Sequence, residues 1–471
     1  MIYIYIFLNL GLNLIMLIGN VNSLFFSYLS LAIAAIFSLI LINVNPAGSR
    51  ISRILNGNNI VIVSLILIFL VAPTVQHFTN STLPIVFESR EWKICIPKVN
   101  FMATLAIYSS TLGIHVENRK FRPRDFPPIF FSLKRFRSIS IVIGCGWFVY
   151  YLVWAKSQGN FFVAIFGTKL GQRNFGISKA NGYGADALLG TLGVLSLCLL
   201  VSIYCFPKWK LPFICLYVSL LLPAFANGLR SKFIFYGLVL LLVLLSKTVK
   251  VKKFNIVILL FLIPILVVSP RVFRGSTEIV SAGSIVRGFD VKNILDTFTQ
   301  EDLAMAPALS LLVQEKQNQN FDFLYGTSYL NSLLKPIPRS FFPNKPVEFD
   351  SQINSLVFPV ESRSVGLSFS ALSEPYVNFG YTGIFIFFYF LSKICQSLYI
   401  RVRDNPSILN ILINSWVAGF TFVLIRGNLT TDFQRVAFPL LTALIVYRFS
   451  KSTTPSAKLS GVYFNISGSS M

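Results

Sequence analysis

Long, nearly charge-free apolar runs are the feature of this sequence that most restricts its fold. They include residues 24–42, 60–75, 187–206, 211–226, 233–245 and 254–268. A helix needs roughly 20 mostly apolar residues to cross the hydrocarbon core of a bilayer, so the longer runs can span it and the shorter ones need their flanks. Of all residues, 54% are hydrophobic and 13% are charged, which is unlike a soluble enzyme. We therefore predict an all-α, polytopic transmembrane helical bundle.

The apolar runs predict about twelve membrane-spanning helices. They are expected near residues 2–19, 24–43, 59–76, 100–116, 138–156, 185–206, 211–228, 232–247, 254–270, 377–398, 407–426 and 434–449. The fourth is the weakest, because it is short and carries Ser109, Ser110 and Thr111, and the alternatives there are a re-entrant segment and a segment packed in the bundle. Residues 1–270 then hold helices one to nine and residues 377–449 hold helices ten to twelve.

The basic residues predict the orientation of the helices, because cytoplasmic loops are the ones rich in Lys and Arg. With the N-terminus inside, the Lys- and Arg-rich loops all fall on the cytoplasmic side, and the acids there are only Glu117, Asp125 and Asp404. This alternation favours twelve helices over eleven or thirteen, with both termini cytoplasmic. The tail, 450–471, is rich in Ser and Thr and is expected to be disordered. The net charge of +23 is explained by these loops, so no nucleic-acid partner is predicted.

The segment 271–376 is the longest one predicted to lie outside the membrane, and we expect it to form an extracytoplasmic loop domain. Its acidic and basic residues are nearly balanced and apolar residues are interspersed, which is typical of folded structure rather than of a connector. An amphipathic helix resting on the membrane or on the bundle is expected near 301–316. Four prolines between 336 and 346 predict an extended, stiff stretch after it.

Several familiar catalytic motifs are absent from the sequence. It has no glycine-rich nucleotide loop, no HExxH and no GxSxG, and its only histidines are His77 and His115. The six cysteines show no metal-site spacing, and Cys95 alone falls in a clear loop. We predict no metal, no cofactor and no disulfide.

Cations at helix ends on the predicted outer side are more informative. The turn 227–232 is only a few residues long, yet it carries Arg230 and Lys232, against the preference for positive charge inside. Snorkelling to the interface is one explanation. The other is a binding site for an anionic substrate, because guanidinium binds phosphate oxygens bidentately and keeps its charge. Further arginines are expected at the same surface, namely Arg271, Arg274, Arg426 and Arg435.

Two more segments of the large loop present charged side chains. The proline-stiffened segment 338–346 carries Arg339 and Lys345, and the segment 368–383, which leads into the tenth helix, carries Glu374. Glu374 has two explanations that we keep open. It is either a functional carboxylate or an acid in the first turn of a helix, where it balances the helix dipole.

Three of these segments resemble the bacterial oligosaccharide repeat-unit polymerases, which build O-antigen and related surface polysaccharides. The segments are GLRSK at 228–232, PRSFFPNKP at 338–346 and SEPYVNFGYTG at 373–383, in that order. The layout is also similar, with about a dozen helices and one large extracytoplasmic loop in the C-terminal half. The resemblance implies an architecture like that of the GT-C membrane glycosyltransferases. The first 200 residues match the family only in general character.

The resemblance implies polymerisation of undecaprenyl-pyrophosphate-linked oligosaccharide units by metal-independent, inverting glycosyl transfer at the outer face of the bacterial inner membrane. Its catalytic candidates are Glu374 as the base and Arg230 and Arg339 as stabilisers of the leaving pyrophosphate. Candidates for binding the pyrophosphate or the glycan are Lys232, Arg271, Arg274, Lys345, Arg426 and Arg435. The expected partners are the lipid-linked oligosaccharide, membrane lipids and a chain-length regulator. Aromatic residues between Phe385 and Phe390 are candidates for lining a lipid groove, although ordinary lipid-facing packing is the favoured explanation for any single Phe.

Two alternatives remain open. An O-antigen ligase shares the layout and the lipid-linked donor but transfers the glycan to the lipid A core. A flippase or other transporter is the non-enzymatic alternative, and it predicts ionisable residues deep within the spans and repeated halves. Lys156, Asp186 and Asp432 fall at helix ends and no internal repeat is evident, which favours the polymerase.

Overall fold

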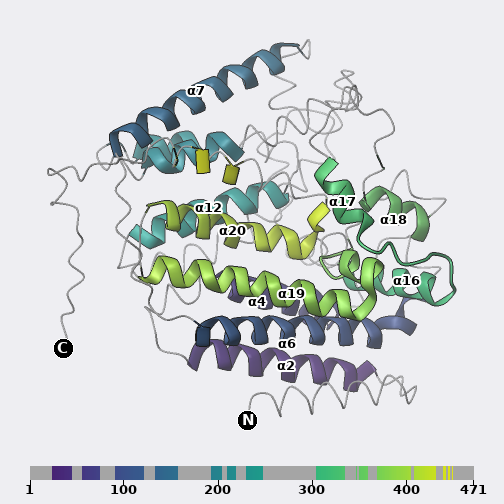
Figure 1. The fold of residues 1–471 in the computed structure, drawn as a ribbon. Helices are drawn as coiled ribbons and strands as arrows, with labels where there is room; N and C mark the ends of the chain where they lie inside the picture. The colour runs from purple at the N-terminus through teal and green to yellow at the C-terminus, as the bar shows by residue number, and fades with distance from the viewer. Residues whose placement is uncertain are drawn as a thin grey trace, which may run out of the picture.

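A computed structural model gives the architecture of the chain (Figure 1). It describes residues 24–44, 56–74, 91–120, 133–157, 193–203, 209, 211–218, 230–247, 304–334, 346, 349–358, 369–404, 408–430, 439–441, 444–445 and 448. Within these ranges all regular secondary structure is helical. The predicted spans 2–19 and 254–270, the proline-rich stretch and the tail 450–471 lie outside them, apart from residue 346.

Five helical segments of the described chain are long and apolar enough to cross a membrane. They are α2 (Leu24–Val44), α4 (Gly57–Ile66) continued by the π-helical turn η1 (Leu67–Val71), α6 (Ile96–Lys120) preceded by the 3-10 turn η3 (Trp92–Cys95), α19 (Ser373–Asp404) and α20 (Ile408–Arg426). They correspond to the second, third, fourth, tenth and eleventh predicted spans. The chain is thus an all-helical protein with several candidate membrane spans, as predicted.

Further helices fall within other predicted spans. They are α7 (Leu133–Ser157), an apolar helix at Gly193–Ile203, a helical stretch at 211–218 and α12 (Arg230–Lys247). In Figure 1, α12 lies beside α20. The Trp416 ring of α20 packs edge-on against the Phe235 ring of α12, with 5.2 Å between the ring centres.

Helix α6 lies between α2 and α19, with which it forms the two most extensive helix contacts described. Its polar residues are turned toward these neighbours: Asn100 Nδ2 donates to Ser27 Oγ of α2 (2.9 Å), and Thr111 Oγ1 donates to Ser38 Oγ of α2 (2.8 Å). Gly113 lets α19 approach so closely that a Cβ there would lie 2.4 Å from the Tyr389 carbonyl oxygen. The predicted fourth span is therefore a central helix of 25 residues rather than a short re-entrant one.

These contacts fix the relative directions of the helices. Residues 27 and 38 of α2 pair with residues 100 and 111 of α6, so the two helices are parallel. Likewise, Phe101 near the start of α6 contacts Tyr381 of α19. Asn118 near the end of α6 bonds to Gln396, further along α19, so α19 runs in the same direction as α6. Helices α4 and α20 run the opposite way, because α4 begins beside Gln396 and the end of α20 meets the start of α19.

The helix directions restrict the number of crossings in the middle of the chain. If every predicted span crosses the bundle, helices α6 and α19, which run in the same direction, need an odd number of crossings between them. Five crossings are predicted there from the apolar runs. Along the chain, α2, α4 and α6 alternate in direction, and so do α19 and α20.

One end of the bundle, which we call the loop end, carries the described parts of the large loop. These are α16 (Met305–Gln317), α17 (Thr327–Leu334) and α18 (Phe349–Val357), which Figure 1 shows beside the start of α19. The amphipathic helix expected near 301–316 corresponds to α16. Unlike a helix resting on a surface, α16 is buried on all sides from Met305 to Val313.

Burial of α16 is explained by its insertion against the start of α6. Ser310 Oγ donates to the Trp92 carbonyl of η3. Cys95 is also buried here, with its Sγ 3.3 Å from Gln317 Oε1. The expectation that Cys95 lies in a loop was therefore wrong, because the 3-10 turn η3 extends α6 toward the loop domain.

The opposite end of the bundle, which we call the amide end, holds a cluster of buried carboxamides. Gln396 Oε1 accepts from Asn56 Nδ2 (3.0 Å) and Asn58 Nδ2 (2.9 Å), and Gln396 Nε2 donates to Asn118 Oδ1 (2.7 Å). With its carboxamide turned over, Asn58 donates instead to the Ser392 carbonyl at 3.0 Å. The cluster ties α4, α6 and α19 together with uncharged groups.

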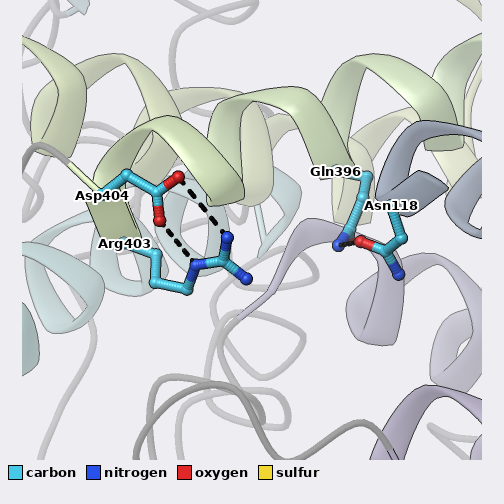
Figure 2. A network of polar contacts seen from close by, with 4 residues as sticks. All are labelled: Asn118, Gln396, Arg403 and Asp404. Carbon is cyan, nitrogen blue, oxygen red and sulfur yellow. Dashed lines mark hydrogen bonds and ion pairs between the residues drawn. The ribbon is translucent and has the colours of Figure 1, made fainter. Parts of the chain in front are cut away.

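Figure 2 shows the Gln396–Asn118 contact beside an ion pair of the same helix end. Arg403 Nε lies 2.7 Å from Asp404 Oδ1, and both side chains are about one-third exposed. These neighbours in sequence join no second helix, so we expect the carboxamides rather than the ion pair to hold this end together.

Candidate functional site

Three segments far apart in the sequence meet at the loop end around Glu374. They are the start of α17, the first turn of α19 and the residues that follow α20. The end of α20 is held there by a backbone bond from Ala371 N–H to the Ile425 carbonyl (3.0 Å). Glu374 is only 1% exposed. A buried carboxylate needs hydrogen-bond donors, and the start of α17 and the residues that follow α20 supply them.

Both oxygens of the Glu374 carboxylate are engaged. Oε1 accepts from Ser328 Oγ (2.9 Å) and from Thr430 Oγ1. Oε2 accepts from the backbone N–H of Thr430 (3.1 Å). These donors belong to segments other than α19, so the carboxylate joins α17 and the end of α20 to the helix that carries it.

Asn378, one turn after Glu374, supports the same arrangement. Its Nδ2 donates to Ser328 Oγ (2.8 Å) and to the Glu374 carbonyl (2.7 Å), while its Oδ1 accepts from Gly326 N–H (2.8 Å). The backbone N–H of Tyr325 also donates to the Asn378 carbonyl (3.2 Å). Asn378 is fully buried. It therefore fixes the turn before α17 against α19 and orients the Ser328 hydroxyl.

The sequence of the SEPYVNFGYTG segment explains its local conformation. Pro375 lies in the first turn of α19, where a missing N–H costs no helical hydrogen bond. The helix is broken at Phe379 and Gly380, and Gly380 has φ 64° and ψ −147°, a region essentially restricted to glycine. A Cβ at Gly383 would lie 2.3 Å from the Pro375 carbonyl oxygen. Both glycines are thus required for the first turn of α19 to fold back toward the cluster.

The raised pKa of Tyr329 in α17 indicates that this region has low polarity. Burial, and secondly the charge of Glu374, raise the pKa of the Tyr329 hydroxyl well above its usual value. Both effects disfavour a second negative charge, so Tyr329 remains a neutral phenol beside the carboxylate.

The structure places two of the nine sequence-predicted site residues at the loop end with their side chains described. Glu374 lies in the first turn of α19, and Arg426 is the last residue of α20, next to the Ile425 carbonyl that binds the start of α19. Arg230 and Lys232 lie in the first turn of α12, of which the backbone alone is described. The remaining candidates lie outside the described residues, namely Arg271, Arg274, Arg339, Lys345 and Arg435.

Three residues of the cluster were not predicted as site residues. Asn378 lies in a segment that the sequence does single out, and a polar residue one turn after Glu374 is a usable signal. Ser328 and Thr430 lie 46 and 56 residues from Glu374 in the sequence, in segments with no motif. Only the fold brings them to the carboxylate.

The arrangement can bind hydroxyl groups and accept a proton. A carboxylate that already accepts from two side-chain hydroxyls is suited to a hydroxyl of a ligand, but Glu374 is buried. A ligand must therefore displace one of its present partners to reach it.

No protein-family model, curated protein or solved structure matches this chain.

Proposed function

We propose that the protein is an oligosaccharide repeat-unit polymerase, which extends a glycan carried on undecaprenyl pyrophosphate. The observation that carries the proposal is the position of Glu374. It lies in the SEPYVNFGYTG segment, at the end of an apolar helical bundle where α20 ends with Arg426. A lipid-linked donor holds its pyrophosphate at the membrane surface and its glycan outside. A base and a cation at one end of membrane-spanning helices suit such a substrate.

In the proposed reaction, a sugar hydroxyl of the acceptor unit gives its proton to the Glu374 carboxylate. The oxygen attacks the anomeric carbon of the donor glycan from the face opposite the pyrophosphate. The bond between that carbon and the phosphate oxygen breaks, and its electron pair leaves with the undecaprenyl pyrophosphate. Arginines directed at the developing charge stabilise the transition state, and Arg230, Arg339 and Arg426 are the candidates for that role.

Helix α19 offers an apolar surface for the lipid parts of the substrates. The rings of Phe385 and Phe390 are exposed, whereas Phe388 on the opposite side is buried. The exposed side of α19 suits a polyprenyl chain or bulk lipid equally, so it supports membrane contact without identifying the chain.

The direct test is loss and restoration of long-chain polysaccharide in the bacterium that encodes the chain. We expect deletion to leave single repeat units attached to their acceptor and no ladder on a gel. A ligase would leave no attached unit, and a flippase would leave the lipid-linked unit on the cytoplasmic face. The proposal fails if the purified chain, in vesicles with lipid-linked repeat units, forms no product longer than one unit.

Site variants test the residues. Arg230→Ala and Arg339→Ala should each abolish the ladder while the protein still reaches the membrane, because each removes a cation from the leaving group. Glu374→Gln should slow elongation. A normal ladder from both arginine variants would remove the argument for an anionic site.

A further inference from the structure

Oxygen Oε1 of Glu374 binds two side-chain hydroxyls, those of Ser328 and Thr430. A carboxylate oxygen has about two lone-pair positions, so Oε1 is filled. If Glu374 is the base of the proposed reaction, the acceptor sugar must place a hydroxyl on this carboxylate. A sugar hydroxyl can bind at Oε1 only if one of the two protein hydroxyls leaves it.

The two hydroxyls differ in how firmly they are held. Thr430 is attached to Glu374 twice, through its hydroxyl to Oε1 and through its backbone N–H to Oε2. Ser328 makes one bond to the carboxylate and belongs to α17, a helix of eight residues. Leu330 of α17 is 63% exposed and Tyr325, just before α17, is 75% exposed. Moving Ser328 breaks its bond to the carboxylate and the bond from Asn378 Nδ2, whereas moving Thr430 breaks two bonds to the carboxylate. We expect Ser328 to be the hydroxyl that leaves, because it belongs to this short, partly exposed helix.

The backbone before α17 allows such a movement. Tyr325 has φ 46° and Gly326 has φ 89°, so the chain makes a sharp turn between the part bonded to α19 and α17 itself. Leu324 N–H and Tyr325 N–H remain attached to the carbonyls of Val377 and Asn378. A rotation after the N–H of Gly326 would withdraw Ser328 from Glu374 and leave these attachments in place, together with the bond from Gly326 N–H to Asn378 Oδ1. It would also break the bond from Asn378 Nδ2 to Ser328 Oγ and the one from Thr430 Oγ1 to the Ser328 carbonyl.

We propose that Ser328 is a positioning residue that occupies the place of an acceptor sugar hydroxyl on Glu374 Oε1. In this proposal, which rests on the proposed function, binding of the acceptor glycan displaces Ser328 and moves α17 aside. Thr430 stays and holds the carboxylate in position. The same carboxylate oxygen thus binds a protein hydroxyl in the closed state and a substrate hydroxyl in the reacting state.

The proposal predicts opposite effects for the two hydroxyls. Ser328→Ala removes a competitor of the acceptor, so the KM for the lipid-linked acceptor should fall, by roughly tenfold for a hydrogen bond to a charged group. Thr430→Val removes a group that orients the carboxylate, so kcat should fall without a lower KM, and Thr430→Ser should restore it. Initial rates in vesicles, measured against acceptor concentration at saturating donor, give both constants.

Ser332→Ala is the matched control for Ser328→Ala. Ser332 lies one turn later on α17 and is equally buried, with 4% of each residue exposed. Its hydroxyl donates to the Tyr329 carbonyl of its own helix (2.6 Å) rather than to Glu374. Ser332→Ala should leave the acceptor KM unchanged.

Hydrogen–deuterium exchange separates this inference from the proposed function, because it needs no activity. Exchange across α17 should be faster in Ser328→Ala than in wild type or Ser332→Ala. An unchanged or raised acceptor KM in Ser328→Ala, or equal exchange in the two serine variants, overturns the displacement role. If wild type forms no polymer, the polymerase proposal is wrong, and so is the proposal that a sugar hydroxyl replaces Ser328 on Glu374. The exchange result then decides by itself whether Ser328 holds α17 closed.

Discussion

The amide end of the bundle gives a quantitative test of what holds the helices together. Replacing Gln396 by Leu keeps an apolar side chain of similar size but removes the two or three hydrogen bonds that its carboxamide makes with α4 and α6. Bonds of this kind between membrane helices contribute about 0.6 kcal/mol each on average. The variant should therefore lose about 1–2 kcal/mol of unfolding free energy, which lowers the ratio of folded to unfolded protein roughly 5- to 30-fold.

The neighbouring ion pair is the matched comparison. Arg403→Gln removes the contact with Asp404, in which both side chains are about one-third exposed. Exposed pairs of this kind contribute about 0–1 kcal/mol to the free energy of unfolding. The measurement is reversible unfolding in mixed micelles, followed by tryptophan fluorescence, to which the buried Trp416 of α20 contributes. Equal losses in the two variants, or a larger loss in Arg403→Gln, would refute the conclusion that the carboxamides hold this end.

Three further predictions concern packing, backbone conformation and ionisation. Gly113→Ala should lower the free energy of unfolding by about 1–3 kcal/mol, because its Cβ would lie 2.4 Å from the Tyr389 carbonyl oxygen. The control is Gly237→Ala in α12, whose Cβ would have nothing within 4 Å. This variant should unfold no more easily than wild type. Gly380→Ala and Gly380→Asn should both lower the free energy of unfolding by about 1–3 kcal/mol. The φ and ψ angles of Gly380 lie outside the left-handed helical region that asparagine tolerates. A stable asparagine variant in the same unfolding measurement would contradict this. Burial raises the pKa of Tyr329, so the neutral Tyr329 hydroxyl should contribute fully to stability below about pH 10. This contribution should be lost as the pH rises further. An absorbance titration of wild type against Tyr329→Phe should show no phenolate from Tyr329 near pH 10.

The sequence was sufficient to predict the apolar helices, because span length follows from bilayer thickness. Prediction from hydropathy was weakest for a helix that lies inside the bundle. Residues such as Asn100 and Thr111 lower the hydropathy of α6, yet their polar groups bond to Ser27 and Ser38 of α2. Hydropathy cannot distinguish a polar residue that has a partner helix from one that ends a span.

The site was predictable only in part, for a similar reason. Glu374 follows from the sequence as an acid at the start of a helix, and the structure has it in the first turn of α19. Its partners Ser328 and Thr430 come from segments that local patterns do not connect to it. The helix-dipole explanation and the functional one remain compatible, because one carboxylate can serve both purposes.

The partners of Glu374 also change how its replacement by Gln must be interpreted. Both carboxylate oxygens accept hydrogen bonds, but a carboxamide has one oxygen and one NH2 group. If its oxygen faces Ser328, its NH2 group faces the Thr430 N–H, and two donors then meet at a cost of about 1–3 kcal/mol. A loss of activity in Glu374→Gln would therefore not by itself identify a base.

Thr430→Val supplies the missing comparison, because it removes one hydrogen bond from the same carboxylate and leaves the carboxylate itself. If Glu374 accepts the proton of the acceptor, Glu374→Gln should reduce kcat by about 10²- to 10⁴-fold, far more than Thr430→Val does. The two variants are compared in vesicles, with their unfolding free energies measured alongside. If their losses of kcat are equal at equal stability, Glu374 only joins α17 and the end of α20 to α19, and the base of the reaction is another residue.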